Sequence, residues 1–308
     1  MALQLLTDGW AYHATQSERF ASELEAAAAA PIAAEDRVRF VRMGVHTTGE
    51  HLKDWPRARR LAERVLDGQA PEAAIAKAWA FLSIARLLAG DAAGAAAAEL
   101  AWMGAAPDGP GAAAVEAKFL LVAALVGSGQ AGAAEPLYLA AIDLARRSDA
   151  AAVATAASQV SGTLATNLLE APSRTPAEMT RMRLAADAMH EFALKSGCDW
   201  YVDQVGHYLR AMVANLSGEP DAALAHVEAA MALIEANGGT PIDETFLHLT
   251  SAHARHLRGE AAAAADALAR SDAMAAAFDQ PGLLDWHRDE RARVFPHLPP
   301  RAVAAAPA

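Results

Sequence analysis

Cysteine is nearly absent from the sequence: Cys198 is the only one among 308 residues. A single thiol excludes any disulfide within one chain, and so excludes the small secreted domains that disulfides hold together. The opening segment, MALQLLTDGW, contains neither Lys nor Arg and only a short apolar run, so it lacks the pattern of a secretory signal peptide. These absences predict a cytoplasmic protein.

Long uncharged apolar runs are missing as well. The two most apolar windows, residues 73–90 and 112–127, each carry charged side chains. Both windows are rich in alanine, which is only weakly lipophilic. We therefore expect them to form buried helices in water rather than membrane spans, and we expect no membrane partner.

Positive charge is in short supply. The chain has 26 Lys and Arg residues against 37 Asp and Glu residues, which gives a formal net charge of −11. An acidic surface is repelled by phosphate backbones, and the sequence contains no compact basic stripe that would offset this repulsion. Nucleic acid is therefore not an expected partner, and the dispersed acidity is explained by solubility.

Patterns typical of β-strands are rare, because Val, Ile, Thr, Tyr and Phe seldom alternate with polar residues. Alanine, the residue with the highest helix propensity, occurs throughout the chain. Gly and Pro interrupt the sequence at intervals that suit helices of about 12 to 20 residues. The composition therefore predicts an all-α protein.

Glycine corners recur in this chain at nearly constant spacing. Gly218 and Gly259 both stand in the context Leu-x-Gly-Glu and are 41 residues apart, while Gly90 and Gly129 are 39 residues apart. Each of these glycines suits the left-handed residue that ends a helix. Asp54-Trp55-Pro56 gives the same layout upstream. The pattern predicts a repeated unit of helix, tight turn, helix and looser link.

The second half of this unit resembles the tetratricopeptide repeat (TPR) family. GEPDAALAHVEAAMAL and GQAGAAEPLYLAAIDL follow the family's Gly-x-x-x-x-Ala-x-x-x-Tyr-x-x-Ala pattern; the matching residues are Gly218, Ala223, Val227 and Ala230 in the first and Gly129, Ala134, Tyr138 and Ala141 in the second. The first half of the family pattern survives only at Trp79 and Leu82. The period is near 40 residues, whereas the family's is about 34.

The resemblance implies an α-solenoid of about six stacked antiparallel helical hairpins, wound as a TPR-like right-handed superhelix. We expect a single repeat domain over residues 1–296 and a flexible tail at 297–308. Within the domain we expect an N-terminal capping helix at about 8–30, hairpins at about 36–280 and a C-terminal capping helix at about 282–294.

The common catalytic signatures are absent, including the phosphate-binding loop, the dinucleotide fingerprint, H-E-x-x-H and G-x-S-x-G. His253 and His256 share a helix face and could hold a metal, but the sequence supplies no third ligand for them. Asp203 and His207 are four residues apart, which suits an oriented general base but is more often an ordinary surface pair on a helix. We therefore predict no enzyme, no metal site and no cofactor.

The repeat alignment indicates a binding surface. When Gly218 and Gly259 are made equivalent, Met212 aligns with His253, and Asn215 aligns with His256. In TPR-like solenoids the first helix of each hairpin lines the concave face, so the resemblance implies that these residues face a groove. The predicted binding residues are Tyr208, Met212, Asn215, Phe246, His253 and His256.

A mostly apolar surface with a few polar groups is typical of a ligand or peptide site. The first hypothesis is a non-enzymatic scaffold that binds a protein or peptide partner on the concave face. The alternative is a small-molecule binding or sensing protein with an apolar cavity inside the superhelix. A third hypothesis is an enzyme that uses one of the two histidine arrangements described above.

The N-terminal segment is rich in ring side chains, with Trp10, Tyr12 and His13 within four residues. Repeat arrays need a capping helix to cover an exposed end, and this segment fits that role. It could also fold over the groove, and the sequence leaves both possibilities open.

Overall fold

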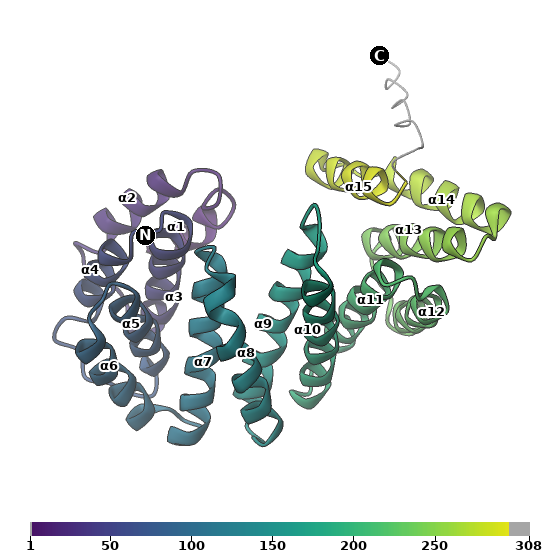
Figure 1. Cartoon of the computed structure of the whole chain (residues 1–308). Helices are drawn as coiled ribbons and strands as arrows, with labels where there is room; N and C mark the ends of the chain where they lie inside the picture. Colours follow the sequence, from purple (N-terminus) through teal and green to yellow (C-terminus); the bar gives the residue numbers. More distant parts are fainter. Residues whose placement is uncertain (1, 296–308) are drawn as a thin grey trace, which may run out of the picture. The chain divides into compact units, whose positions relative to one another are not determined.

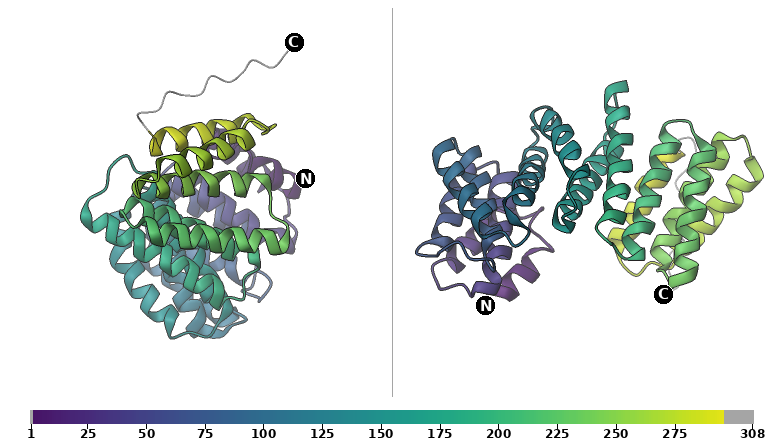
Figure 2. Two further views of the ribbon diagram at one scale, coloured as in Figure 1. Left: turned by 90° about the vertical axis from the view of Figure 1, so that its right-hand side faces the viewer. Right: turned by 90° about the horizontal axis from the view of Figure 1, so that it is seen from below.

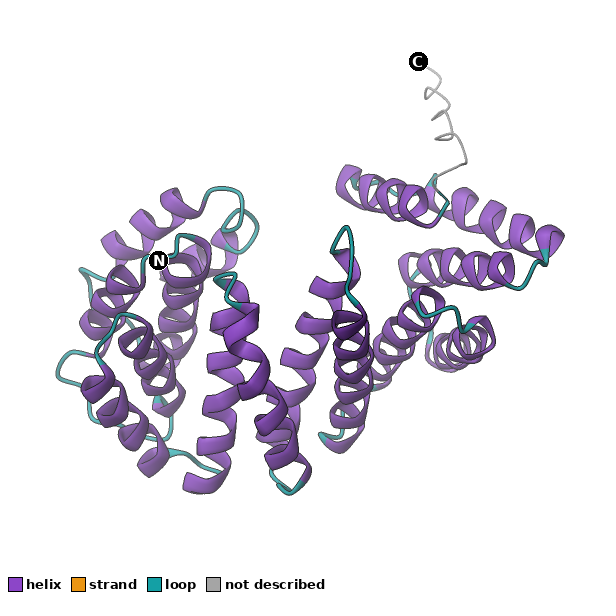
Figure 3. Ribbon diagram, in the orientation of Figure 1, coloured by secondary structure: helices purple, strands orange, loops and turns teal. Residues whose placement is uncertain are grey.

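The computed structural model describes residues 2–295, and this part of the chain contains helices and no strand (Figures 1 and 3). The elements in chain order are α1 (Ala2–Gly9), α2 (Ser17–Ala27), α3 (Ala34–Gly44), the π-helix η1 (Val45–His51), α4 (Trp55–Leu66), α5 (Ala76–Leu88), α6 (Ala92–Ala105), α7 (Gly109–Gly127), α8 (Ala131–Arg146), α9 (Ala151–Glu170), α10 (Pro176–Lys195), α11 (Trp200–Leu216), α12 (Pro220–Asn237), α13 (Pro241–Leu257), α14 (Ala261–Ala275) and α15 (Pro281–Val294). The predicted all-α fold is confirmed.

The six predicted hairpins are also present. In chain order, they are formed by α3 and η1 with α4, α5 with α6, α7 with α8, α9 with α10, α11 with α12, and α13 with α14. The two halves of a hairpin pack closely because alanine lets their backbones approach, as at Ala223 and Ala230 of α12, which are both fully buried. Within each unit, neighbouring hairpins pack on one another, as α6 does on α7 and α12 does on α13, which is how a repeat fold builds its core.

The glycine corners have the predicted conformation. Gly218 and Gly259 have φ angles of +72° and +78°, in the left-handed region that a side chain would strain. The residue after each glycine donates its backbone N–H to a carbonyl five positions earlier, from Glu219 to Ala214 and from Glu260 to Arg255, both at 2.9 Å. This is the hydrogen bond of a Schellman corner. The same bond recurs after the two upstream glycines, so the corners are equivalent, as the alignment requires.

Helix starts follow the sequence signals. The side chains of Asp54 and Asp91 each accept a backbone N–H in the first turn, at 2.9 Å, and so cap α4 and α6. Pro56 and Pro220 occupy the first turns of α4 and α12, where a missing N–H is not felt. The junction between α9 and α10 uses a capping box on Thr175 instead of a glycine.

The chain divides into two compact units, residues 1–160 and 161–308, with the boundary inside α9. The single repeat domain expected over residues 1–296 stays a prediction. The expected tail at 297–308 lies outside the described residues. Within unit 2, α11 to α14 form successive antiparallel layers, and α15 lies against α13 and α14 (Figures 1 and 2). The C-terminal capping helix predicted near 282–294 corresponds to α15.

The N-terminus differs from the prediction. The single helix expected near residues 8–30 is two helices, because α1 ends at Gly9 and a turn of residues 10–16 precedes α2. Gly9 lies against the ring of Phe20, and a Cβ at this glycine would come within 1.9 Å of that ring. Tyr12 in the turn packs edge-on against the same ring and hydrogen bonds to Glu23. The chain therefore folds back so that α1 and the turn pack on α2.

A π-helix interrupts the first hairpin. α3 continues directly into η1, in which the backbone N–H of Leu52 bonds to the carbonyl of Thr47, five residues earlier, at 3.1 Å. Gly49 faces the ring of Trp55, where a Cβ would come within 2.3 Å. Glycine at this position therefore allows the wider turn of η1 to pack closely against the start of α4.

One helix, α7, is long and apolar enough to cross a membrane by length and composition alone. In unit 1 it packs against α5, α6, α8 and η1, and it buries Phe119 and Val122 completely. Its Glu116 pairs with Lys77 of α5 at 2.6 Å. α7 thus contributes to the core of this unit.

Candidate functional site

The predicted binding residues lie on α11 and α13, the first helices of two neighbouring hairpins. Three of them, Met212, Asn215 and His253, line one small cavity that opens to solvent and has about 10 Å³ of interior space. Met212 and His253, which the repeat alignment makes equivalent, therefore line the same cavity in the structure. The remaining lining residues come from α11, α13 and α15: Leu216, Leu249, Thr250, Glu290, Arg293 and Val294.

Asn215 is the polar centre of this cavity. Its side chain is buried, with 4% of the residue exposed. The side-chain Nδ2 donates to the backbone carbonyl of Thr250 at 3.0 Å, which ties α11 to α13. The amide oxygen, Oδ1, is buried and has no hydrogen-bond partner within the protein. A buried acceptor without a donor costs about 1 to 3 kcal/mol, so a donor brought to this oxygen would stabilise the protein.

His253 and His256 occupy different environments. His253 is half-buried, and desolvation, aided by the positive charge of Arg293 and by His256, lowers its pKa to about 4. It is therefore a neutral imidazole near pH 7, able to donate from one nitrogen and accept at the other. His256 is exposed, and the ring of Phe295 packs edge-on against both imidazoles. Within residues 2–295 this pair has no place in any group of three close metal ligands.

The other two predicted residues, Tyr208 and Phe246, lie outside the cavity. Tyr208 is half-buried, and burial together with the negative charge of Glu290 raises its pKa above the ordinary range. Phe246 is 3% exposed and lies beneath Trp286 of α15, with ring centroids 4.1 Å apart. The structure therefore places α15 over part of the surface that the sequence assigned to a groove.

α15 is held by polar contacts at its middle and near its end. At its middle, His287 hydrogen bonds to Ser271 of α14 at 2.8 Å, and Ser271 donates to the carbonyl of Thr245 at 2.9 Å. Near its end, Arg293 donates to the carbonyl of Leu169 in α9 at 3.4 Å and pairs with Glu290. The arginine beside the cavity is therefore fixed by neighbours on two sides.

The second motif from the sequence, Asp203 with His207, belongs to a network across three helices. Asp203 makes its short contact with His190 of α10, at 2.6 Å, while His207 Nε2 lies 3.7 Å away. His207 faces His226 of α12 instead, with their Nδ1 atoms 3.1 Å apart. The sequence pattern on α11 therefore identified the correct carboxylate, Asp203. The residue that Asp203 contacts most closely, His190, comes from the preceding hairpin.

The protonation of this network follows from its donors. Arg210 donates to His190 Nδ1 at 3.1 Å, so His190 Nε2 carries the hydrogen that is donated to Asp203. Burial is the main cause that lowers the pKa of His207, and it lowers the pKa of His226 to about 4. Both nitrogens of His190 are engaged, and a guanidinium lies beside them. The hydrogen-bonding capacity of His190 is therefore satisfied within the protein.

No protein-family model matches the chain, and no curated protein matches it. Among solved structures, the crystal structure of the apo form of RapI is similar to this chain, with a TM-score of 0.51 and 12% sequence identity. The match covers 96% of this chain and 82% of RapI. Identity at this level shows the fold alone. Together with the six hairpins and their equivalent corners, it defines the chain as a helical-repeat protein of the α-solenoid class.

Proposed function

We propose that this protein is a non-enzymatic scaffold that binds a peptide segment of a partner protein at the cavity between α11, α13 and α15. The single observation that carries the proposal is the buried amide oxygen of Asn215, which lines the cavity and has no partner. A backbone N–H of an extended peptide supplies the donor that this oxygen lacks. The apolar side chains of Met212, Leu249 and Val294 then receive a side chain of the peptide.

The size of the cavity favours a peptide over a small molecule. Pockets for small ligands usually enclose about 300 to 1,000 Å³ and bury most of the ligand. The cavity here has only about 10 Å³ of interior space and opens to solvent, so it is far too small to enclose such a ligand. A longer partner would instead lie across the mouth of the cavity and continue over the surface, and repeat scaffolds offer such extended surfaces.

Other features agree with this proposal. The repeats have the hairpins and glycine corners of a degenerate TPR-like array, which supports classifying them as TPR-like despite their longer period. The single cysteine agrees with a cytoplasmic setting, and the net charge of −11 disfavours nucleic acid. We accordingly expect a protein partner and no catalysed reaction.

The proposal is tested by site-specific photocrosslinking in source lysate. A benzophenone amino acid replaces Met212 at the cavity, and a control carries it at Leu139, an exposed residue of α8. We expect a defined partner that crosslinks only from position 212. Asn215→Ala should weaken this partner's binding about tenfold, because the loss of one buried hydrogen bond costs about 1 kcal/mol or more.

A matched control is Asn237→Ala on α12, where the asparagine is exposed and bonds only to the carbonyl of its own helix. This variant should bind like the wild type. Equal partner sets from positions 212 and 139, or equal binding by the Asn215→Ala and Asn237→Ala variants, would show that the cavity is not the binding site.

A further inference from the structure

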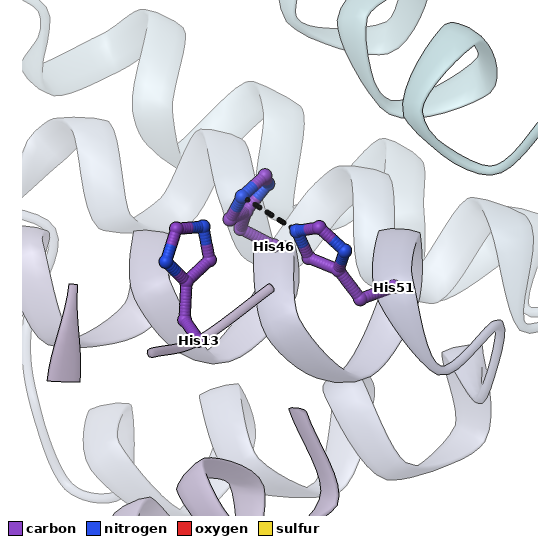
Figure 4. A group of neighbouring side chains, drawn as sticks. All are labelled: His13, His46 and His51. Atoms are coloured by element: carbon purple, nitrogen blue, oxygen red, sulfur yellow. Dashed lines mark hydrogen bonds between the residues drawn. The ribbon is translucent and has the colours of Figure 1, made fainter. Parts of the chain in front are cut away.

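Three histidines from two separate segments converge in unit 1. His13 lies in the turn between α1 and α2, and His46 and His51 lie on η1 (Figure 4). One ligand nitrogen from each ring can be chosen so that all three lie within 4.8 Å of one another. His13 and His46 are half-buried and His51 is exposed, so the group lies at the surface with one side open to solvent.

The π-helix is what brings two of these rings together. In an α-helix, residues five apart lie about 140° apart around the axis, so their side chains diverge. In a π-helix the hydrogen bonds join residues five apart, so His46 and His51 lie on the same face in successive turns. Their rings are 4.6 Å apart, and their Nε2 atoms are 3.1 Å apart. Such π-helical segments are frequently found at functional sites.

The remaining ring nitrogens of His46 and His13 are already engaged. His46 Nδ1 bonds to the carboxylate of Glu50 at 2.7 Å, and His13 Nδ1 donates to the carbonyl of Trp10 at 2.7 Å. Each contact places the ring hydrogen on Nδ1, so each Nε2 carries a lone pair. In this structure the lone pair of His46 Nε2 accepts a hydrogen bond from His51 Nε2, and a bound metal ion would replace that hydrogen. Metal-binding histidines typically donate their other N–H to a carboxylate or a backbone carbonyl, which fixes the tautomer and the ring orientation.

Glu50 is itself given room by a neighbouring helix. A Cβ on Gly127, at the end of α7, would come within 2.5 Å of Glu50 Oε2. Glycine at this position therefore lets the carboxylate reach His46. Gly127 has a helical backbone that any residue can adopt, so its conformation does not require glycine. The carboxylate of Glu50 occupies the space where a side chain at position 127 would lie.

The distances suit a zinc-like ion. Two imidazole nitrogens bound to one tetrahedral Zn²⁺, with Zn–N bonds of about 2.0 to 2.1 Å, lie about 3.3 Å apart. The Nε2 atoms of His46 and His51 already have a separation of 3.1 Å. His13 completes the group by a modest movement of its ring, which stacks on Trp10 at a centroid distance of 4.4 Å.

We propose that His13, His46 and His51 bind one divalent transition-metal ion of the zinc class through their Nε2 atoms. Imidazole ligands suit zinc, copper, nickel and iron, and three histidines leave a fourth position for water or an anionic ligand. The ion joins the turn between α1 and α2 to η1. Glu50 is a positioning residue, because it acts through His46.

The test uses the full-length chain after removal of metals with a chelator. Co²⁺ is titrated and followed by its visible ligand-field absorption, and Zn²⁺ is then added to displace it. We expect one Co²⁺ per chain with the intense bands of a four-coordinate site and complete displacement by Zn²⁺. His46→Ala and His51→Ala should each weaken binding at least a hundredfold, and Glu50→Gln should weaken it about 10- to 100-fold.

The matched control is His190→Ala in unit 2, which should retain wild-type affinity. Circular dichroism identifies any variant that has lost its fold, and the exposed His51 provides a variant with little effect on packing. The proposal is overturned if the wild type takes up no Co²⁺ or if the folded His51→Ala protein binds it like the wild type. It is also overturned if His190→Ala abolishes binding.

Discussion

The two histidine clusters of this protein are built from the same residue type and reach opposite chemical outcomes. In unit 1, His46 and His13 use Nδ1 for a carboxylate and a carbonyl, and His46 Nε2 hydrogen bonds to Nε2 of His51, itself a candidate ligand. In unit 2, His190 has Asp203 on Nε2 and Arg210 on Nδ1. In the first arrangement a metal ion can replace the hydrogen shared by two ligand nitrogens, whereas in the second a guanidinium donates to one ring nitrogen of His190.

The difference shows that proximity of histidines is a weak indicator of a metal site. Both clusters place three ligand atoms within 4.8 Å of one another. The two clusters differ in the groups that hydrogen bond to their histidines. In unit 2 the guanidinium of Arg210 donates to His190, and its positive charge opposes a metal cation there. Arg210 itself pairs with Asp187 at 2.9 Å, so it cannot leave without breaking that contact too.

The largest expected effect is stabilisation of unit 1 by metal. Zn²⁺ at a thousand times its dissociation constant should stabilise the folded state by about 4 kcal/mol, because the unfolded chain cannot hold three histidines together. In differential scanning calorimetry this corresponds to a rise of roughly 10 °C in the transition that includes unit 1. The His51→Ala variant should show little rise. An equal rise in both proteins would place the metal elsewhere.

A smaller effect is expected from packing in the unit 2 cluster. A Cβ on Gly206 of α11 would come within 2.6 Å of the His190 ring, which is held from both sides. We expect Gly206→Ala to lower the free energy of unfolding by about 1 to 3 kcal/mol, measured by urea denaturation. Gly104→Ala in α6 is the matched control, because a Cβ there meets nothing within 4 Å. It should be neutral or slightly stabilising. Equal effects of the two substitutions would contradict the tight contact at His190.

The smallest effect is the pH dependence of unit 2. The folded state keeps His226 and His253 neutral down to about pH 4, mainly through burial, whereas unfolded histidines protonate near pH 6.5. The groups facing His226 are Arg210, His207, His190 and Asp187.

Because the folded pKa values are depressed, this contribution is complete above pH 6.5 and is lost as the pH falls from 6.5 to 4. Both rings are partly exposed, so we expect about 1 kcal/mol from each after solvent screening. Urea denaturation between pH 7.5 and 4.5 measures the loss, and the His226→Gln variant should lose less. Stability that rises on acidification across this range would contradict the assignment.

Sequence patterns predicted most of the fold because its signals are local. A glycine with positive φ, a capping aspartate and a proline in the first turn act within a few residues, so Gly218, Asp54 and Pro220 could be assigned directly. The prediction of a single N-terminal helix at about residues 8–30 was wrong because Gly9 packs on Phe20, a contact between two segments that no local sequence pattern reveals.

The candidate sites were only partly predictable. The repeat alignment brought Met212 and His253 to one cavity, because equivalent positions of stacked repeats lie side by side. The alignment could not show that α15 covers Phe246, because the sequence of a short terminal helix does not indicate which helices it packs against. The histidines of η1 were missed because five-residue spacing separates side chains on an α-helix, and only the π-helix unites them.

Anomalous diffraction at the zinc absorption edge tests the central claim most directly. Crystals of the full-length protein grown with stoichiometric Zn²⁺ should show one strong peak about 2.0 to 2.1 Å from the Nε2 atoms of His13, His46 and His51. A peak beside His190 and Asp203 instead, or no peak at either cluster, would contradict the assignment of metal chemistry to unit 1.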